Sequence, residues 1–418
     1  MPDQTPNVVA VGAYERDNFG DMLYAELVDQ LVGSRAKFTF AAPFARDMTR
    51  AFGRDIPAVA PLLDRGPVDA IWTVGGEVGT AELGHAYRTA FGENSRAFNR
   101  MTPEQREEVL FQATGTHVRD SAYMPRPSSH RGSADAAFVL NSVGLSAISR
   151  IRGARRAALD ATLHEATFIS VRDARSHDFL SSAGIEHIFV PDLAHLISEI
   201  HSPKVIEGRY ALIQVPEFAV RGHGVEIWAE AIADSLSNTG LGVRFFMAGT
   251  APGHDTVTTA ERLAEVVGAS LGDDVHVSEA RGVWPRVDEI ANASLWLGGS
   301  LHGRIISSAY GVPRVSIGSR KTDAYAASWD PTMPFGATPE TLGDAVTAAI
   351  TTKHDAKGSA SLASQARSGI ERALAHVVDF SGRSRTDIVA ARLQYRVDEV
   401  EALRRIAQDQ ERQLNATK

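Results

Sequence analysis

The feature that most constrains this fold is a regular alternation of short apolar runs with longer segments of helical periodicity. Residues 8–12 form an apolar run, and within 21–32 the residues Leu23, Leu27 and Leu31 recur at the spacing of one helix face. Strands separated by helix-length segments favour a parallel sheet covered on both faces. The same pattern predicts strands at 37–41, 69–74, 137–141, 167–171 and 188–190, and helices at 146–163 and 174–183.

A second series of the same kind begins near residue 210, after the pattern breaks at 201–204. The sequence therefore predicts an α/β protein with two doubly wound, Rossmann-like domains, an N-terminal one over 1–200 and a C-terminal one over 208–352. Two such units in tandem face each other across a cleft, a usual place for ligands. In the second series we expect strands at 210–215, 243–247, 275–277, 295–297 and 314–317, with helices at 225–237, 257–267, 283–293 and 304–310.

Two regions depart from this alternation. Residues 84–132 form a polar insertion with Arg126 and His130 near its end, and both a lid over an anionic substrate and a solvated surface insertion fit it. Residues 360–418 form a predicted helical tail with an apolar stripe that includes Leu393. The tail is expected to pack on its own protein or on a second copy, as a homo-oligomer.

The charge balance disfavours a nucleic-acid partner, because 43 Lys and Arg stand against 51 Asp and Glu, a formal net charge of −8. The chain has no cysteine, which excludes disulfides and thiolate metal sites. It has neither a leader-like N-terminus nor an apolar run of transmembrane length, so we expect a soluble, cytoplasmic protein. No P-loop or His-Glu-x-x-His motif is present, and no metal site is predicted.

The most informative stretch is 295–313, where an apolar strand runs through small residues into a helix. Gly299 and Ser300 lie on the predicted turn, and His302 and Arg304 on the first helical residues. Free N–H groups and the helix dipole favour an anion there. His302 can donate to a phosphate or exchange a proton, or it can simply cap the helix. The spacing does not match a nucleophile elbow, since His302 takes the place of the second glycine, which disfavours a serine hydrolase.

Two glycine turns follow strands in the N-terminal half. Asn18, Gly20 and Asp21 open a helix, where Asn18 and Asp21 can contact a ligand hydroxyl, or Asp21 can serve only as a helix N-terminal residue. Gly75 and Gly76 follow another strand, where a ligand can approach the backbone closely. A tight turn alone explains these two glycines equally well.

Arg172 and Asp192 come at the ends of two further strands. Because the carboxyl ends of parallel strands meet at one edge of a sheet, both side chains are expected to face the cleft. There they can clamp a carboxylate and act as an acid or base. A buried ion pair is the alternative.

In their order along the chain, these motifs resemble the polysaccharide pyruvyl transferase family. The resemblance spans roughly residues 8–330, and the segment around Lys321 resembles the family's lysine-bearing segment after the last strand. One departure is that several members have Arg-Leu-His where this chain has Ser300-Leu301-His302, with Arg304 one turn along as a replacement. The motifs are Asn18-x-Gly20-Asp21, Gly75-Gly76, Ser170-Val171-Arg172-Asp173, Pro191-Asp192-Leu193, Ser300-Leu301-His302-Gly303 and Gly311-Val312-Pro313.

The resemblance implies a fold similar to the two-domain glycosyltransferases of the GT-B type. It also implies a pyruvyltransferase, which moves the pyruvyl group of phosphoenolpyruvate onto a pair of hydroxyls of a glycan acceptor to form a ketal. Phosphoenolpyruvate is then the donor substrate, and no separate cofactor is expected. Under this hypothesis Arg172, Arg304 and Lys321 clamp the donor anion, and His302 binds phosphate or donates a proton. Asp192 and Asp21 are candidate bases or ligands of acceptor hydroxyls, and the substrate-binding set is completed by Ser300, Asn18, Gly20, Gly75, Gly76 and Gly299.

Two other functions fit the sequence. A nucleotide-sugar-dependent glycosyltransferase would use the same cleft, with a helix N-terminus gripping the diphosphate. A non-catalytic binding protein on the same fold is the other. The sequence does not determine the acceptor sugar, the ketal positions, the oligomeric state or the role of residues 84–132.

Overall fold

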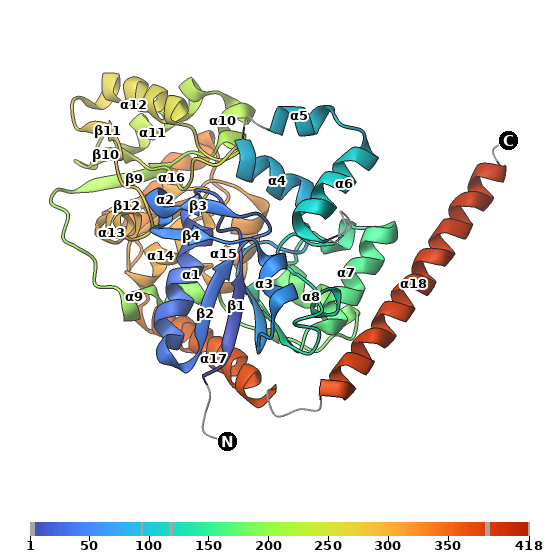
Figure 1. The fold of residues 1–418 in the computed structure, drawn as a ribbon. Coiled ribbons are helices and arrows are strands. Elements are labelled where there is room, and N and C mark those ends of the chain that lie inside the picture. The colour runs from blue at the N-terminus through green and yellow to red at the C-terminus, as the bar shows by residue number, and fades with distance from the viewer. Residues whose placement is uncertain (1–4, 93–94, 117–119, 381–384, 417–418) are drawn as a thin grey trace.

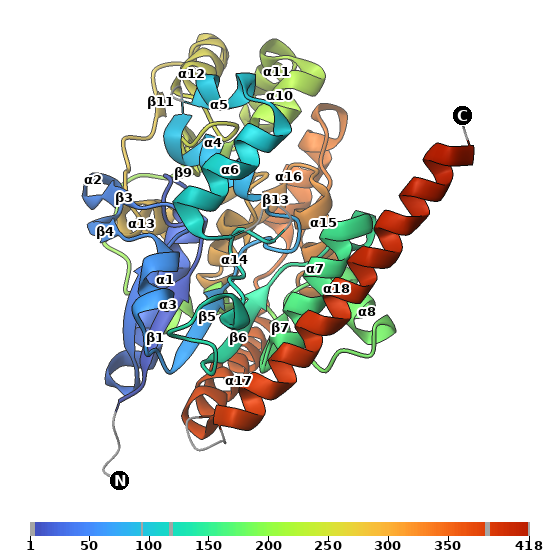
Figure 2. The same cartoon turned by 45° about the vertical axis from the view of Figure 1, so that its right-hand side comes forward.

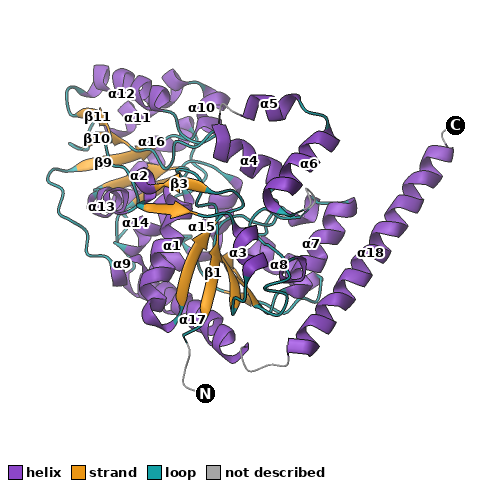
Figure 3. Ribbon diagram, viewed as in Figure 1, coloured by secondary structure: helices purple, strands orange, loops and turns teal. Residues whose placement is uncertain are grey.

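Two parallel sheets form the body of the protein (Figures 1 and 3). The computed structural model describes residues 5–92, 95–116, 120–380 and 385–416. The central strands of the first sheet are buried along their whole length, because helices cover both faces. This first sheet has six parallel strands in the order β2 (Lys37–Ala41), β1 (Asn7–Val11), β5 (Ala70–Val74), β6 (Ala137–Val143), β7 (Phe168–Val171) and β8 (Ile188–Phe189).

The second sheet repeats this architecture. Its strand β9 is buried along its whole length and pairs in parallel with a strand on each side. The order of its five strands is β11 (Val275–Val277), β10 (Gly242–Phe245), β9 (Tyr210–Gln214), β12 (Leu295–Gly298) and β13 (Arg314–Ser316). The predicted fold class, two Rossmann-like α/β units facing a cleft, is thereby confirmed.

Helices connect the strands and begin at the carboxyl ends of the sheets. Several begin with a side-chain cap, and Asn18, Asp173, Ser300 and Ser319 each accept a hydrogen bond from a backbone N–H in the first turn. The helices around the two sheets are α1 (Phe19–Val32), α3 (Val59–Arg65), α7 (Gly153–Glu165), α8 (Ala174–Ser182), α9 (Ile197–Ile200), α10 (Glu217–His223), α11 (Val225–Leu236), α12 (Val257–Leu271), α13 (Trp284–Asn292), α14 (Leu301–Ala309), α15 (Arg320–Trp329) and α16 (Leu342–Thr351).

A small element near the N-terminus was not predicted. Strands β3 (Arg46–Met48) and β4 (Arg54–Ile56) form an antiparallel pair, joined by the short helix α2 (Thr49–Phe52). Each strand has only three residues, too few to show a clear alternation of apolar and polar positions.

The polar insertion is partly helical and partly buried. It holds α4 (Leu83–Phe91), α5 (Ser95–Arg100) and α6 (Pro103–Thr114). Its returning segment contributes Tyr123, Met124 and Arg126 to the interior, each at most 3% exposed. The insertion is therefore no simple solvated loop, since its last part packs in the core of the first sheet's domain.

The C-terminal region contains two long helices, and the first of them returns to the first sheet. Helix α17 (Ala356–Phe380) places Ile370 and Leu374 in one apolar core with residues of β1 and β6. It therefore completes the first sheet's domain, although the chain has already built the second sheet. The domain limits 1–200, 208–352 and 360–418 stay a prediction.

Helix α18 (Arg385–Ala416) packs along α7, and its far end leaves the body of the protein (Figures 1 and 2). Arg392 and Glu399 on its inner side are buried, whereas Leu393, Val397 and Val400 are between 46% and 59% exposed. The body thus covers the polar anchors of the helix and leaves the apolar stripe open, and a homo-oligomer through this stripe stays a prediction. Among the described helices, none is long and apolar enough to cross a bilayer.

Candidate active site in the cleft between the two sheets

The loop after β1 crosses the cleft and docks on the second sheet's domain. The backbone N–H of Phe19 donates to the carbonyl of Ala248 at 2.9 Å, and Asn18 forms a backbone bridge with Gly249. Asp17 forms a double ion pair with the buried Arg286, at 2.8 and 3.2 Å. These contacts bring the N-terminus of α1 against the N-terminus of α14.

His302 lies where these two helix ends meet. Its ring packs edge-on against Tyr24, with 5.1 Å between the ring centroids, and no space remains for a Cβ atom on Gly20. The buried Nε2 atom has no hydrogen-bond partner among the described residues. Burial lowers the pKa of His302 to about 4, against the pull of Asp192, with Arg172 adding to the shift. The imidazole is therefore neutral at pH 7, and its Nε2 atom is unpaired.

Arg172, Asp192 and Tyr24 form a buried cluster beneath His302. The guanidinium Nη1 of Arg172 lies 2.6 Å from Asp192 Oδ2 and also donates to the Tyr24 hydroxyl. That hydroxyl donates to the same carboxylate oxygen at 2.5 Å. Burial alone would raise the pKa of Asp192, but Arg172, His302 and the Tyr24 hydrogen bond bring it below its ordinary value. The charged form of Asp192 is thus stabilised, and it fixes Arg172 at the end of β7.

Asp192 itself does not border a cavity. Its side chain is 0% exposed, and its second oxygen accepts from the N–H of Ala194 at 2.9 Å. Asp192 therefore lies behind Arg172 and does not face the cavity. The two residues form the buried ion pair that the sequence analysis gave as the alternative.

A cavity of about 350 Å³ lies above this cluster, between the two sheets. Arg172 and His302 form part of its wall, and Lys321 at the start of α15 forms another part. Part of the Lys321 side chain is exposed to solvent. The surrounding protein nonetheless desolvates its amine and lowers its pKa, and the charge of Arg172 lowers that pKa further. Of the residues named from the sequence, the wall contains Asn18, Asp21, Gly76, Arg172, Gly299, Ser300, His302 and Lys321.

The turn before α14 is organised by a glutamine that the sequence analysis missed. Gln214 ends β9, and its Oε1 accepts from the N–H groups of both Gly299 and Ser300 at 3.0 Å. The Ser300 hydroxyl in turn accepts from the N–H of Gly303 at 3.3 Å. Protein groups therefore already bind three of the N–H groups expected to face an anion, which leaves the cationic side chains as the main anion ligands of this cavity.

Arg304 lies outside the site, unlike its predicted role as an anion clamp. It donates to the carbonyl oxygens of Asp330, Met333 and Pro334 and to the Ser316 hydroxyl, at 2.8 to 2.9 Å. The physical reason is its position two residues after His302, about 200° further around the helix at 3.6 residues per turn. Arg304 therefore faces the interior of the second domain and supports the loop after α15.

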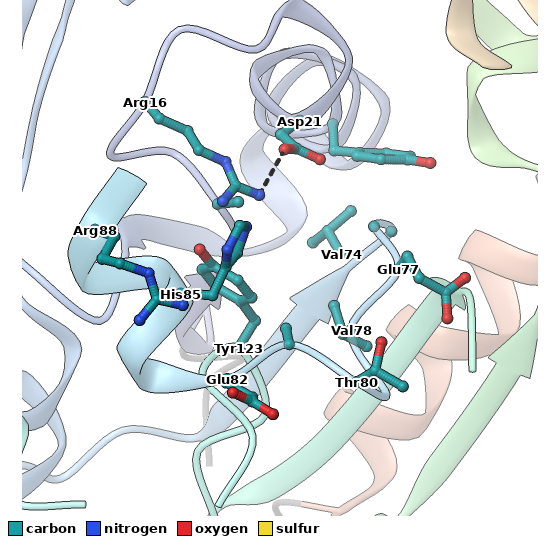
Figure 4. Close-up of a pocket in the computed structure, with 16 residues that line it drawn as sticks. Arg16, Asp21, Val74, Glu77, Val78, Thr80, Glu82, His85, Arg88 and Tyr123 are labelled. Atoms are coloured by element: carbon teal, nitrogen blue, oxygen red, sulfur yellow. Dashed lines mark hydrogen bonds and ion pairs between the residues drawn. The ribbon is translucent and has the colours of Figure 1, made fainter. Parts of the chain in front are cut away.

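A second cavity of about 430 Å³ adjoins the first, on the side of the polar insertion (Figure 4). Both cavities are lined by Asp21, Gly76 and Glu77. Gly75 lines the second one with a φ of +59°, and a side chain there would collide with the ring of Tyr24. Gly75 is thus required by the close contact with the Tyr24 ring, whereas Gly76 forms part of the wall that the two cavities share.

Glu77 is the other residue that the sequence analysis missed. Its Oε2 accepts from the Ser146 hydroxyl at 3.2 Å, and its buried Oε1 has no hydrogen-bond partner within the described residues. Burial raises the pKa of this carboxyl, opposed by Arg172 and assisted by Asp173. The signal in the sequence was its place directly after the glycine turn at a strand end. Asp21, by contrast, already accepts from Asn18 at 2.9 Å.

Among the described residues, no group of three or more His, Asp or Glu side chains is placed to hold a metal ion. The site therefore offers cations, a neutral imidazole and carboxyl groups, around one cavity with a second beside it.

Residues 135–320 match the family model described as polysaccharide pyruvyl transferase. No curated protein matches the sequence significantly. Among solved structures, the S. aureus MnaA–UDP co-structure aligns with a TM-score of 0.50 at 10% identity, over 87% of this chain and 91% of that chain. This likeness shows a shared two-domain fold of the GT-B type.

Two further structures align with lower scores. UDP-GlcNAc 2-epimerase from Methanocaldococcus jannaschii in complex with UDP-GlcNAc and UDP has a TM-score of 0.48 at 11% identity, over 84% of this chain and 93% of that chain. The glycosyltransferase VinC in complex with DTDP has a TM-score of 0.41 at 14% identity, over 89% of this chain and 99% of that chain. The matched segment, residues 135–320, includes Arg172, Asp192 and His302, and its similarity to this family indicates a transferase.

Proposed function

We propose that the protein transfers the pyruvyl group of phosphoenolpyruvate to two hydroxyls of a glycan, forming a ketal. The observation that supports this most directly is the convergence of Arg172, His302 and Lys321, from both halves of the chain, on one cavity of about 350 Å³. Phosphoenolpyruvate carries a phosphate and a carboxylate on a three-carbon frame. Two cations with a hydrogen-bonding imidazole match that charge distribution.

The reaction is balanced without a further reactant. A proton adds to the methylene carbon, and the adjacent carbon becomes an oxocarbenium centre that the first sugar hydroxyl attacks. The bond from that carbon to the phosphate oxygen then breaks, and the second hydroxyl closes the ring. The two hydroxyls lose two protons. One replaces the proton that the acid gave to the methylene carbon, and the other leaves with phosphate. The enzyme must therefore supply an acid, a base and cations.

The geometry suggests how these roles divide. Arg172 and Lys321 bind the two anionic groups, and His302, neutral at pH 7, hydrogen-bonds the phosphate or passes a proton after taking one up. Glu77 borders both cavities and has a raised pKa, which suits a group that exchanges a proton between the acceptor hydroxyl and the donor carbon. Asp21 borders both cavities as well, and with Asn18 it is a candidate ligand of the acceptor. Asp192 acts through Arg172 as a positioning residue.

The deciding experiment measures phosphate release from phosphoenolpyruvate by the full chain with a panel of glycan acceptors. Loss of the Arg172 guanidinium should cost about 2–4 kcal/mol of transition-state stabilisation, or roughly 30- to 1000-fold in rate. Arg65→Ala, on the exposed end of α3, is the matched control and should be silent. Turnover of nucleotide sugars instead of phosphoenolpyruvate would favour a glycosyltransferase, and turnover of neither would favour a binding protein. The cytoplasmic location expected from the sequence stays a prediction.

A further inference from the structure

The polar insertion builds one wall of the second cavity. Helix α4 contributes His85 and Arg88 from one face, and Arg16 of the loop after β1 points toward them from above (Figure 4). The two arginines also act on the imidazole between them, because burial, Arg16 and Arg88 together lower the pKa of His85. The insertion therefore adds the guanidinium of Arg88 to this wall, beside Arg16 of the loop after β1.

Most of the charged groups that line this cavity already have a partner. Arg16 pairs with Asp21 at 3.3 Å, and Glu82 pairs with Arg155. Glu77 has a raised pKa, which favours its neutral form. Arg88 is left: it is half-buried in the cavity wall, and across the described ranges of the chain it has neither a hydrogen bond nor an ion pair.

The position of the cavity relates it to the proposed donor site. It shares Asp21, Gly76 and Glu77 with the cavity that contains Arg172 and His302. A molecule held in it can thus bring a hydroxyl to the shared wall while the rest of the molecule extends toward α4. A volume of about 430 Å³ is in the range of sites for small ligands.

We propose that this second cavity binds the glycan acceptor through an anionic substituent, a carboxylate or a phosphate, held by Arg88. The inference rests on the proposed function, since it assigns the acceptor class of that same site. A guanidinium that is partly removed from water and lacks a partner gains most from a planar or tetrahedral oxyanion, which it can bind with two hydrogen bonds. A neutral sugar would leave that charge unpaired.

The first experiment measures binding without donor chemistry. The full chain is titrated by calorimetry with methyl glucuronide, with methyl glucoside 6-phosphate and with methyl glucoside. At least one anionic probe should bind 10-fold or more tightly than the neutral one, and the two anionic probes distinguish a carboxylate site from a phosphate site. Arg88→Ala should remove this preference, while Arg100→Ala on exposed α5, the matched control, should keep it.

A second variant shows which cavity the anion occupies. Lys321→Ala alters only the proposed donor cavity, so anionic binding should survive it. Loss of binding in Lys321→Ala with retention in Arg88→Ala would overturn the proposal, and so would equal binding of the three probes. Thermal melts of each variant establish that it is folded.

The activity measurement separates this inference from the proposed function. With an anionic acceptor and phosphoenolpyruvate, Arg88→Ala should raise the KM for acceptor about 10- to 100-fold and leave the KM for phosphoenolpyruvate unchanged. A parent protein that releases no phosphate from phosphoenolpyruvate contradicts the proposed function, whereas the calorimetric preference still tests the anion site. Turnover that is equally efficient with neutral and anionic acceptors contradicts the inference alone.

Discussion

The imidazole of His302 occupies the space that a side chain at Gly20 would need. The two residues lie in different halves of the chain, Gly20 in the first turn of α1 and His302 in the first turn of α14. The N-termini of α1 and α14 can thus approach each other because Gly20 has no side chain. The position of His302 is therefore set in part by the half of the chain that does not contain it.

Gly20→Ala should therefore damage activity without unfolding the protein. The new methyl group displaces the His302 ring, and a displacement on the order of 1 Å can cost about 100-fold in rate. The measurement is phosphate release beside a thermal melt. Gly343→Ala in α16, where an added Cβ meets open space, is the matched control and should keep full activity. A fully active Gly20→Ala would mean that the imidazole position is unimportant.

Asp192→Asn should reveal a positioning role. The change removes the charge that fixes Arg172 but leaves a side chain of the same shape, so the KM for phosphoenolpyruvate should rise about 10-fold or more as the guanidinium loses its fixed orientation. If Asp192 were instead the base, kcat would fall and its acid limb would disappear from the pH profile. The comparison is the split between kcat and KM across pH 5 to 9.

Arg304→Ala should lower stability and spare donor binding. It leaves Asp330 with Arg314 as its remaining partner and several buried carbonyl groups without a donor. Breaking a buried ionic network of this kind costs about 3–5 kcal/mol. Urea unfolding measures the loss, and calorimetry with phosphoenolpyruvate at low temperature measures binding. A stable variant that no longer binds the donor would restore the role expected from the sequence.

His302 should make the protein less stable as the pH falls from about 6.5 to 4. In the folded protein its pKa is lowered to about 4, so in this window the unfolded chain takes up a proton that the folded chain does not. At pH 4.5 the effect amounts to roughly 2–3 kcal/mol, and it vanishes above pH 7. Urea unfolding of the parent and of His302→Gln at pH 7.5 and 4.5 should show a smaller loss in the variant. An identical loss in both would mean that His302 titrates normally.

Arg392→Ala should release the tail helix from the body. The Arg392 guanidinium donates to the carbonyl oxygens of Ala134 at 2.6 Å and Ala136 at 2.8 Å, in a buried position. Leaving those acceptors unmet costs about 3 kcal/mol, visible as a lower free energy of unfolding. Arg405→Ala, on the exposed far part of α18, is the control and should change nothing measurable. Equal stability of the two variants would show that the Arg392 contacts do not hold the helix on the body.

The sequence was sufficient where the physical signal is local. Apolar runs and helical periodicity predicted the strands of both sheets, because residues close in the chain determine a period of two or 3.6. The helix predicted over 21–32 runs from Phe19 to Val32 for the same reason. Since parallel strands end at a common edge, even the meeting of Arg172 and His302 at one cavity followed from the order of elements.

Only the tertiary structure decided which of the candidates reach that cavity. Arg304 and His302 are two positions apart, and the packing of α14 on the second sheet turned one inward and the other toward the cleft. Asp192 was buried beneath Arg172, whereas Glu77, with no motif of its own, came to border both cavities. Side-chain direction and burial depend on neighbours far away in the chain, and no local pattern carries that information.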